Sequence, residues 1–142
     1  MDKKIHLKIV TPIKTTLDAH VDMVIMQAID GELGVLRGHV PLATILTSGV
    51  LRYYDDEKVG NIALFGGMAE INQKEVVVLA DIAEKPEDID AERARLAEER
   101  ARRRLSEKMA DLDEQRAKYA LRKALVRQEL TGKLTTVADK VE

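Results

Sequence analysis

Apolar and polar residues alternate at the start of the chain, where Ile5, Leu7 and Ile9 are separated by polar side chains. A period of two is the pattern of a strand with one buried face. Further short apolar runs follow up to residue 85, and most end at a glycine, a proline or a charged turn. They cover residues 21–29, 35–36, 42–46, 50–54, 62–65, 68–71 and 75–80, and a further short strand is expected around residues 14–17. Their number and spacing predict a β-sandwich of about ten short strands rather than a βαβ fold.

Within this half, Gly31 and Gly34 are typical of a turn at residues 30–34. Gly66 and Gly67 are expected to form a bend or bulge between two strands.

The pattern changes at Pro86, the last proline of the chain. Beyond it the strong helix formers Ala, Glu, Arg, Leu and Lys prevail, and no glycine occurs until Gly132. A narrow apolar stripe recurs at spacings of three and four: Ala94, Ala97, Ala101 and Leu105. This stripe predicts a helix over residues 87–105. Pairs such as Glu98 with Arg102 and Glu99 with Arg103 suit its exposed face.

A second helix is predicted over residues 111–130, after a bend at residues 106–110. Its apolar positions are Ala117, Ala120 or Leu121, Ala124 and Leu125. An alanine stripe buries little surface, so the two helices are expected to hold together weakly. The tail from Thr131 onward is expected to be poorly ordered. The chain is therefore an α+β protein, with a sandwich over residues 1–85 and an antiparallel two-helix hairpin within residues 86–142.

Composition removes several classes of function. The 142 residues carry a net charge of −2 with both signs mixed, which gives no sign of nucleic-acid binding. There is no cysteine, hence no disulfide framework or thiolate zinc site. No apolar run approaches the ~20 residues that span a bilayer, and the N-terminus lacks the apolar core of a secretory signal. We expect a cytoplasmic protein that reaches a membrane only through a partner.

No catalytic constellation stands out. His6, His20 and His39 are isolated along the chain, without the spacing of a metal-binding motif. The Ser48 segment lacks the GxSxG pattern, and there is no Walker A loop. We expect neither enzyme activity nor a metal site.

Three segments together resemble the epsilon subunits of F-type ATP synthases. They read GELGVLRGHVPL at residues 31–42, GGMAEI followed by VVVLAD at residues 66–71 and 76–81, and IDAERA at residues 89–94. The resemblance covers nearly the whole chain in order. It implies a sandwich-and-hairpin fold in the rotor stalk, in contact with the gamma subunit and the c-ring. It also implies helices that leave the sandwich, reach the catalytic head of alpha and beta subunits and inhibit ATP hydrolysis.

The IDAERA segment is either an ordinary helix start or a nucleotide site. On the second interpretation, an acceptor beside apolar side chains grips adenine, and the Arg93 fork holds phosphate. In family members that bind ATP as a regulator, this motif has that role, helped by a preceding glutamate and basic residues of the second helix. The residues implied here are Glu84, Ile89, Asp90, Arg93, Ala94, Arg100, Lys123 and Arg127. Lys123 stands where the family pattern has arginine. Bound ATP is expected to hold the hairpin folded.

Two further surfaces have a structural and a functional interpretation. The loop over residues 31–42 is either simple turn chemistry or a contact with the polar loops of the c-ring, through Glu32, Arg37 and His39. The arginine run is either a solvated helix face or a docking site for an acidic segment of the catalytic beta subunit. That run, with one residue of the second helix, comprises Arg102, Arg103, Arg104 and Arg122.

The sequence thus predicts a non-catalytic rotor subunit of a proton- or sodium-translocating ATP synthase, at the cytoplasmic face of the cell membrane. No catalytic cofactor is expected, and ATP is the expected regulatory ligand. Two alternatives stay open. In the first, the chain is a free-standing ATP-sensing module. In the second, it is a static structural adaptor whose hairpin never moves.

Overall fold

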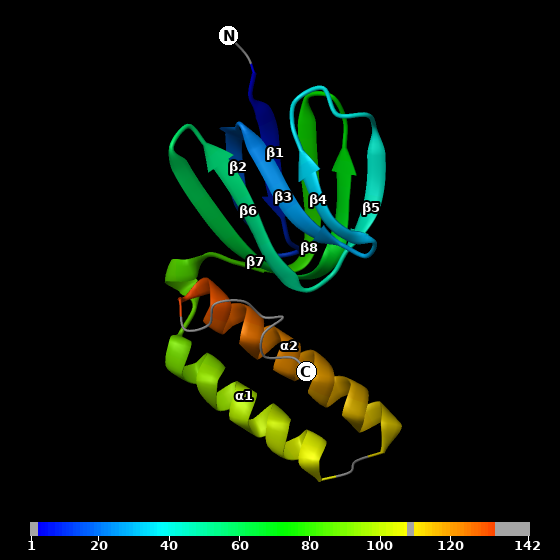
Figure 1. Cartoon of the computed structure of the whole chain (residues 1–142), viewed down its shortest axis with the longest axis vertical. Coiled ribbons are helices and arrows are strands. Elements are labelled where there is room, and N and C mark those ends of the chain that lie inside the picture. The colour runs from blue at the N-terminus through cyan, green and yellow to red at the C-terminus, as the bar shows by residue number, and fades with distance from the viewer. Residues whose placement is uncertain (1–2, 108–109, 133–142) are drawn as a thin grey trace. The chain divides into compact units, whose positions relative to one another are not determined.

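The protein is described by a computed structural model over residues 3–107 and 110–132. Its chain divides into two compact units, Met1–Lys85 and Pro86–Glu142. The first unit holds all the described strands and the second holds the helices (Figure 1). Each unit is treated by itself below.

The first unit is a single sheet that folds over on itself into a sandwich (Figure 1). The strands described are β1 (Ile5–Val10), β2 (Thr15–Val21), β3 (Met23–Ala28), β4 (Gly31–Val35), β5 (Leu42–Leu46), β6 (Gly49–Asp55), β7 (Lys58–Ile71) and β8 (Glu75–Glu84). Their order is β2-β1-β8-β7-β5-β3-β4, and β6 pairs with both β3 and β7. The first strand pairs with the last in parallel, whereas the other pairs are antiparallel. The sandwich prediction is confirmed, with eight strands in place of about ten.

The count falls because one pair of predicted strands is continuous. The segments at residues 62–65 and 68–71 form a single strand, β7, which passes through Gly66 (φ 81°) and Gly67 (φ 132°). A Cβ on Gly67 would lie 2.3 Å from the carbonyl oxygen of Leu79, so only glycine allows the close approach of β8. The bend expected here is therefore a kink inside a strand.

The turn predicted at residues 30–34 is wrong in extent. Residues 31–35 form β4, which pairs with β3, and only Ile29 and Asp30 make the turn. Gly31 has a φ of 124°, as expected for this position, but Gly34 does not have a positive φ. The tight two-residue connection lets the chain turn back sooner than the glycine spacing indicates.

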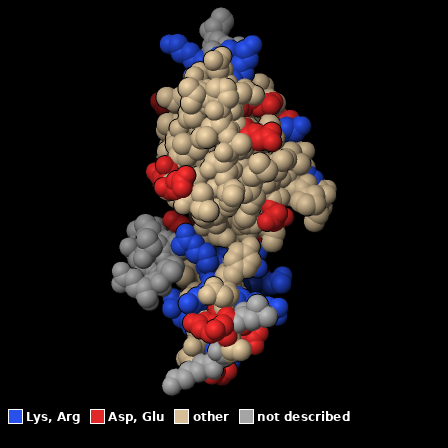
Figure 2. All heavy atoms as spheres, turned by 90° about the vertical axis from the view of Figure 1, so that its right-hand side faces the viewer, with Lys and Arg blue, Asp and Glu red and all other residues tan. Residues whose placement is uncertain are grey.

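The alternation at the N-terminus places the core as predicted. Ile5, Leu7 and Ile9 are each 0 % exposed and join the main hydrophobic cluster. On the outer face, Ile45 pairs with Met68, and Met68 pairs with Leu79. These three side chains are 59 %, 37 % and 43 % exposed. Figure 2, which faces the side of the sandwich where β5 lies, shows a mainly uncharged surface there. We call Ile45, Met68 and Leu79 the apolar row.

The second unit begins with a 3-10 turn over Pro86–Asp88, followed by α1 (Ala91–Ser106) and α2 (Asp111–Leu130). The prediction that α1 starts at residue 87 is wrong, because Asp90 caps the helix and Ala91 is its first residue. The amide of Ile89 donates instead to Pro86 in the preceding turn. The bend is bounded by Ser106 and Asp111, with residues 108–109 outside the described part. Of the tail that is expected to be poorly ordered from Thr131 onward, residues 131–132 form a hydrogen-bonded turn, and residues 133–142 lie outside the described part.

The helices meet along the predicted alanine stripe. Ala94 and Ala101 are buried on α1, and Ala97 and Leu105 are half-buried. On α2 the buried positions include Ala117, Leu121, Ala124 and Leu125. One polar group interrupts these small side chains: Gln128, which is 5 % exposed. Its amide Nε2 donates to Oε1 of Glu98 on α1 at 2.7 Å.

Candidate ligand and partner surfaces

Asp90 lies at the point where the chain enters α1, with extended backbone angles (φ −89°, ψ 107°). Its Oδ1 accepts hydrogen bonds from the amides of Glu92 at 3.0 Å and Arg93 at 3.1 Å. These bonds satisfy two amides that have no partner inside the helix. Asp90 therefore has a structural role that is independent of any ligand.

The capped start changes the predicted nucleotide face. Ile89 and Asp90 precede the helix, so they do not share a helical side with Arg93 and Ala94 as expected. Arg93 is exposed and Ile89 half-buried, whereas Ala94 is only 3 % exposed. The Ala94 methyl group thus belongs to the buried stripe. Glu84 is the last residue of β8 and belongs to the sandwich unit.

The bond from Gln128 to Glu98 fixes how the two helices align. The helices are antiparallel, so each step back from Gln128 along α2 matches one step forward from Glu98 along α1. Arg127 therefore lies near the level of Glu99, and Lys123 near the level of residue 103. At a rise of ~1.5 Å per residue, these cations lie about 9 and 15 Å along the axis from Arg93. Arg100 is exposed and lies, like Arg127 and Lys123, toward the end of the hairpin that is farther from Asp90. The hairpin therefore spaces Asp90 and Arg93 at one end of an elongated array and Arg100, Lys123 and Arg127 toward the other.

Lys123 has a defined position within this array. Its Nζ lies 4.7 Å from the ring centroid of Tyr119, one turn earlier on α2. This cation–π contact holds the ammonium group beside an aromatic side chain that is 46 % exposed.

The arginine run is largely solvent-facing. Arg103 and Arg104 are exposed, and Arg122 on α2 is half-buried. Arg102 donates through Nε to Glu98 at 2.7 Å, which confirms one predicted pair. The second pair is wrong: Glu99 binds Arg95, one turn earlier, at 2.7 Å. Arg95 also binds Glu92, so its guanidinium group bridges two carboxylates, which favours its pairing with Glu99 over that of Arg103.

The proposed c-ring residues occupy two places. Glu32 lies within β4, where it accepts from Gln27 at 3.0 Å and pairs with Arg52 at 3.3 Å. Arg37 and His39 lie in the following loop. The Arg37 Nη1 donates to the carbonyl oxygen of Lys4 at 3.1 Å, and the His39 Nδ1 donates to that of Val40 at 2.6 Å. Glu32 thus lies in a strand and has two polar partners, whereas the sequence placed it in a loop.

Two of the histidines, which are isolated along the chain, come together in space. His6 and His20 face each other across β1 and β2, and their rings stack at 4.6 Å. The His6 ring nitrogens lie 2.5 Å from Asp18 and 3.2 Å from Glu75. The hydrogen bond from His6 lowers the pKa of the Asp18 carboxyl group. Recognising residues 15–21 as a strand and pairing it with residues 5–10 would have found this cluster.

A second cluster also escaped the sequence. Lys4 forms an ion pair with Asp55, and its Nζ lies 3.6 Å from both Asp22 and Asp56. The hydrogen bond to Asp55 raises the pKa of Lys4. Within residues 3–107 and 110–132, these three aspartates are the only group of metal-ligating type with its ligand atoms close together. The Lys4 ammonium group already neutralises part of their charge.

No described helix is both long and apolar enough to cross a membrane.

Comparison with known proteins identifies a family whose two domain models match this chain. The beta-sandwich domain model of the ATP synthase delta/epsilon chain matches residues 4–86, and the long alpha-helix domain model matches residues 87–130. The ATP synthase epsilon chain of Carboxydothermus hydrogenoformans is 48 % identical over 106 residues, 75 % of this chain and 79 % of that one. The epsilon chain of Nitratidesulfovibrio vulgaris strain DP4 is 42 % identical over 132 residues, 93 % of this chain and 98 % of that one.

A solved structure is similar over most of the chain. It is a chain of the Euglena gracilis mitochondrial ATP synthase, in a structure described as OSCP/F1/c-ring in rotational state 1. The TM-score is 0.76 at 26 % identity, covering 86 % of this chain and 78 % of that chain. The two domain models follow one another without a gap, on either side of the border between the sandwich and the helices. The chain therefore belongs to the ATP synthase delta/epsilon chain family, as the three sequence segments indicated.

Proposed function

We propose that this chain is a non-catalytic subunit of the central stalk of an F-type ATP synthase. Its sandwich joins the gamma subunit to the c-ring, and the complex holds it at the cytoplasmic face of the membrane. The observation that carries the proposal is the pair of adjoining domain matches over residues 4–130. The similar chain of the Euglena gracilis enzyme, from a structure of F1 with a c-ring, supports the same assignment.

The apolar row offers a surface for the gamma subunit. Ile45, Met68 and Leu79 lie side by side on three paired strands and are all more than a third exposed. A contiguous apolar patch of this kind marks a protein–protein contact on a soluble domain. The polar loop with Arg37 and His39, together with Glu32, suits the polar loops of the c-ring.

Reconstitution tests the stalk assignment. Met68→Glu is expected to weaken incorporation of the chain into a complex of alpha, beta and gamma subunits, because it places a charge in the apolar row. The matched control is Val59→Glu, which adds the same charge at another exposed apolar position (53 % exposed). Failure of the unmodified chain to enter the complex, or equal effects of both variants, would contradict the assignment.

We further propose that the hairpin binds ATP as a regulator. The array from Asp90 and Arg93 to Arg100, Lys123 and Arg127 suits ATP, with Asp90 as the acceptor for the adenine ring and the cations, Arg93 among them, as donors to the phosphates. Ile89 supplies half-buried apolar surface beside the ring end, and Glu84 stays a predicted member of the set. Ligand bound only to the folded hairpin stabilises that state.

In the extended state, the helices restrain ATP hydrolysis by docking on an acidic segment of the catalytic head. Arg103 and Arg104 are available for this because they are exposed, and Arg102 and Arg122 extend the basic surface. The alanine stripe supports such a change, because small side chains leave little apolar surface to be lost when the helices separate.

Nucleotide titration of the full chain tests the regulatory proposal. Saturable binding of ATP is expected, and Arg93→Ala is expected to weaken it by about tenfold or more, as for the loss of a charge-assisted hydrogen bond. In the assembled complex, replacing Arg103 and Arg104 with alanine is expected to raise ATP hydrolysis. No saturable signal up to millimolar ATP would refute regulation by nucleotide, and unchanged hydrolysis would refute the docking surface.

A further inference from the structure

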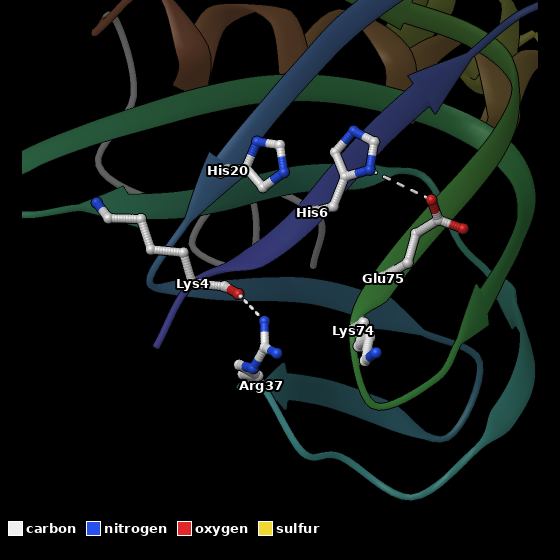
Figure 3. Close-up of a pocket in the computed structure, with 6 residues that line it drawn as sticks. All are labelled: Lys4, His6, His20, Arg37, Lys74 and Glu75. Carbon is white, nitrogen blue, oxygen red and sulfur yellow. Dashed lines mark hydrogen bonds and ion pairs between the residues drawn. The ribbon is translucent and has the colours of Figure 1, made fainter. Parts of the chain in front are cut away.

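A pocket of about 250 Å³ opens near the start of β1 (Figure 3). It is lined by Lys4, His6, His20, Arg37, Lys74 and Glu75. These residues come from the segment before β1, from β1 and β2, from the loop after β4, from the turn before β8 and from β8 itself. Basic side chains outnumber acidic ones on its wall.

Backbone hydrogen bonds build this pocket. The His6 amide donates to the carbonyl oxygen of Lys74 at 2.9 Å, and the Gly38 amide donates to that of Gln73 at 2.8 Å. The Arg37 Nη1 donates to the carbonyl oxygen of Lys4 at 3.1 Å (Figure 3). Three segments far apart in sequence are thus tied together, and the guanidinium group is oriented by the main chain.

Two of the side chains that line the pocket already have a partner. The Lys4 amine binds Asp55 and points away from the other lining residues (Figure 3). The Glu75 carboxylate lies 3.2 Å from His6 (Figure 3). Among the described residues, neither Arg37 nor Lys74 forms an ion pair through its side chain. Two cations from different segments therefore face one concave site without a counterion from the described chain.

The donor set favours an anion over a cation. A metal ion here would lie beside Arg37 and Lys74 and be repelled by both. A tetrahedral anion, by contrast, matches the two-pronged guanidinium donor and the compact charge of lysine. We propose that this pocket binds a phosphate group, held by Arg37 and Lys74 with the His20 ring at its side. The group is either the headgroup phosphate of an anionic lipid or a small soluble phosphate compound.

The site has no residue in common with the proposed nucleotide array, but it shares Arg37 with the proposed c-ring contact. Bound phosphate would therefore compete with that contact, so the site belongs to the free chain or to the margin of the assembly. The pocket is therefore tested in the chain alone, where no c-ring competes for Arg37.

The experiment is a titration of the full chain with inorganic phosphate at constant ionic strength, followed by amide chemical shifts. Saturable shifts are expected at residues 37–38 and 73–75. Arg37→Gln and Lys74→Gln should each weaken binding by about tenfold or more, as for the loss of one charge-assisted hydrogen bond. Lys14→Gln is the control, since it removes an exposed lysine from the turn after β1, at the opposite end of that strand from Lys4.

A second arm uses phosphatidylcholine vesicles with and without phosphatidylglycerol. Binding that requires phosphatidylglycerol and is lost in both pocket variants supports a lipid source, and binding of inorganic phosphate supports a soluble one. The proposal is overturned if neither ligand produces saturable shifts at these residues. It is also overturned if the control weakens binding as much as the pocket variants do.

Discussion

The hydrogen bond between Gln128 and Glu98 gives the hairpin a measurable weak point. Gln128 is almost fully buried, and its Nε2 has two acceptors: Glu98 at 2.7 Å and the Ala124 carbonyl oxygen at 3.5 Å. Glu98→Ala removes the better acceptor and leaves a buried donor with a long contact. Leaving such a group unsatisfied costs ~1–3 kcal/mol. The expected result is a shift of the hairpin toward the open state by about tenfold for each ~1.4 kcal/mol lost.

Native-state hydrogen exchange of the α2 amides near Gln128 measures this opening directly. The control is Glu99→Ala, which removes the neighbouring carboxylate. Glu99 is exposed and pairs with Arg95, so the loss should amount to only ~0.3–0.5 kcal/mol. A second variant, Glu98→Ala with Gln128→Leu, removes donor and acceptor together and should recover most of the loss, because no buried amide is then stranded.

Equal exchange protection in Glu98→Ala and Glu99→Ala would refute this reasoning, and so would a double variant that is less protected than Glu98→Ala alone. Should opening of the hairpin also restrain hydrolysis, as proposed, Glu98→Ala will lower ATP hydrolysis in the assembled complex. The exchange result stands by itself whether or not that functional effect is seen.

Three other positions make separate predictions. Asp90→Ala should cost ~1 kcal/mol of hairpin stability through the lost cap, whereas Asp90→Asn should keep the cap. Thermal unfolding measures the stability of both variants. Weaker ATP binding by Asp90→Asn would then indicate that Asp90 also contacts the ligand. Gly67→Ala should unfold the sandwich or lower its unfolding midpoint strongly, because the methyl group meets a backbone carbonyl of β8, whereas Gly34→Ala has open space and should be nearly neutral; circular dichroism distinguishes the two. The pKa of Asp18 is lowered below its unfolded value of ~3.9, so its bond to His6 stabilises the fold above about pH 4 and is lost as the pH falls through the folded pKa. Asp18→Asn should flatten that part of the pH–stability curve in acid unfolding, and an unchanged curve would count against the bond.

Features with a short sequence period were predictable. Ile5, Leu7 and Ile9 lie in the core because a strand alternates its faces every residue. Ala94 and Ala101 are buried because seven residues return a helix to nearly the same side. Burial at these positions follows from local geometry, so a single segment carries the information.

Features that depend on the partner strand, or on competition between nearby groups, were not predictable from one segment. The stacking of His6 on His20 requires the register between β1 and β2. The start of α1 was misplaced because Asp90 suits the helix dipole and also serves as a cap, and the hydrogen bonds decide for the cap. For the candidate nucleotide site, the sequence supplied the residue types, whereas the helix alignment came from one bond between Gln128 and Glu98.

The parallel pairing of β1 with β8 has a consequence for how the chain is made. Leu7 pairs with Val76, so the first strand waits for about seventy further residues to be synthesised before its neighbour exists. Until then, β1 has only β2 as a partner, and its other edge is unprotected against pairing with foreign strands. Domains generally fold in the order in which they leave the ribosome. The sandwich should thus close in one late step, shortly before the helices emerge, and a nascent chain truncated before residue 75 should be prone to aggregate.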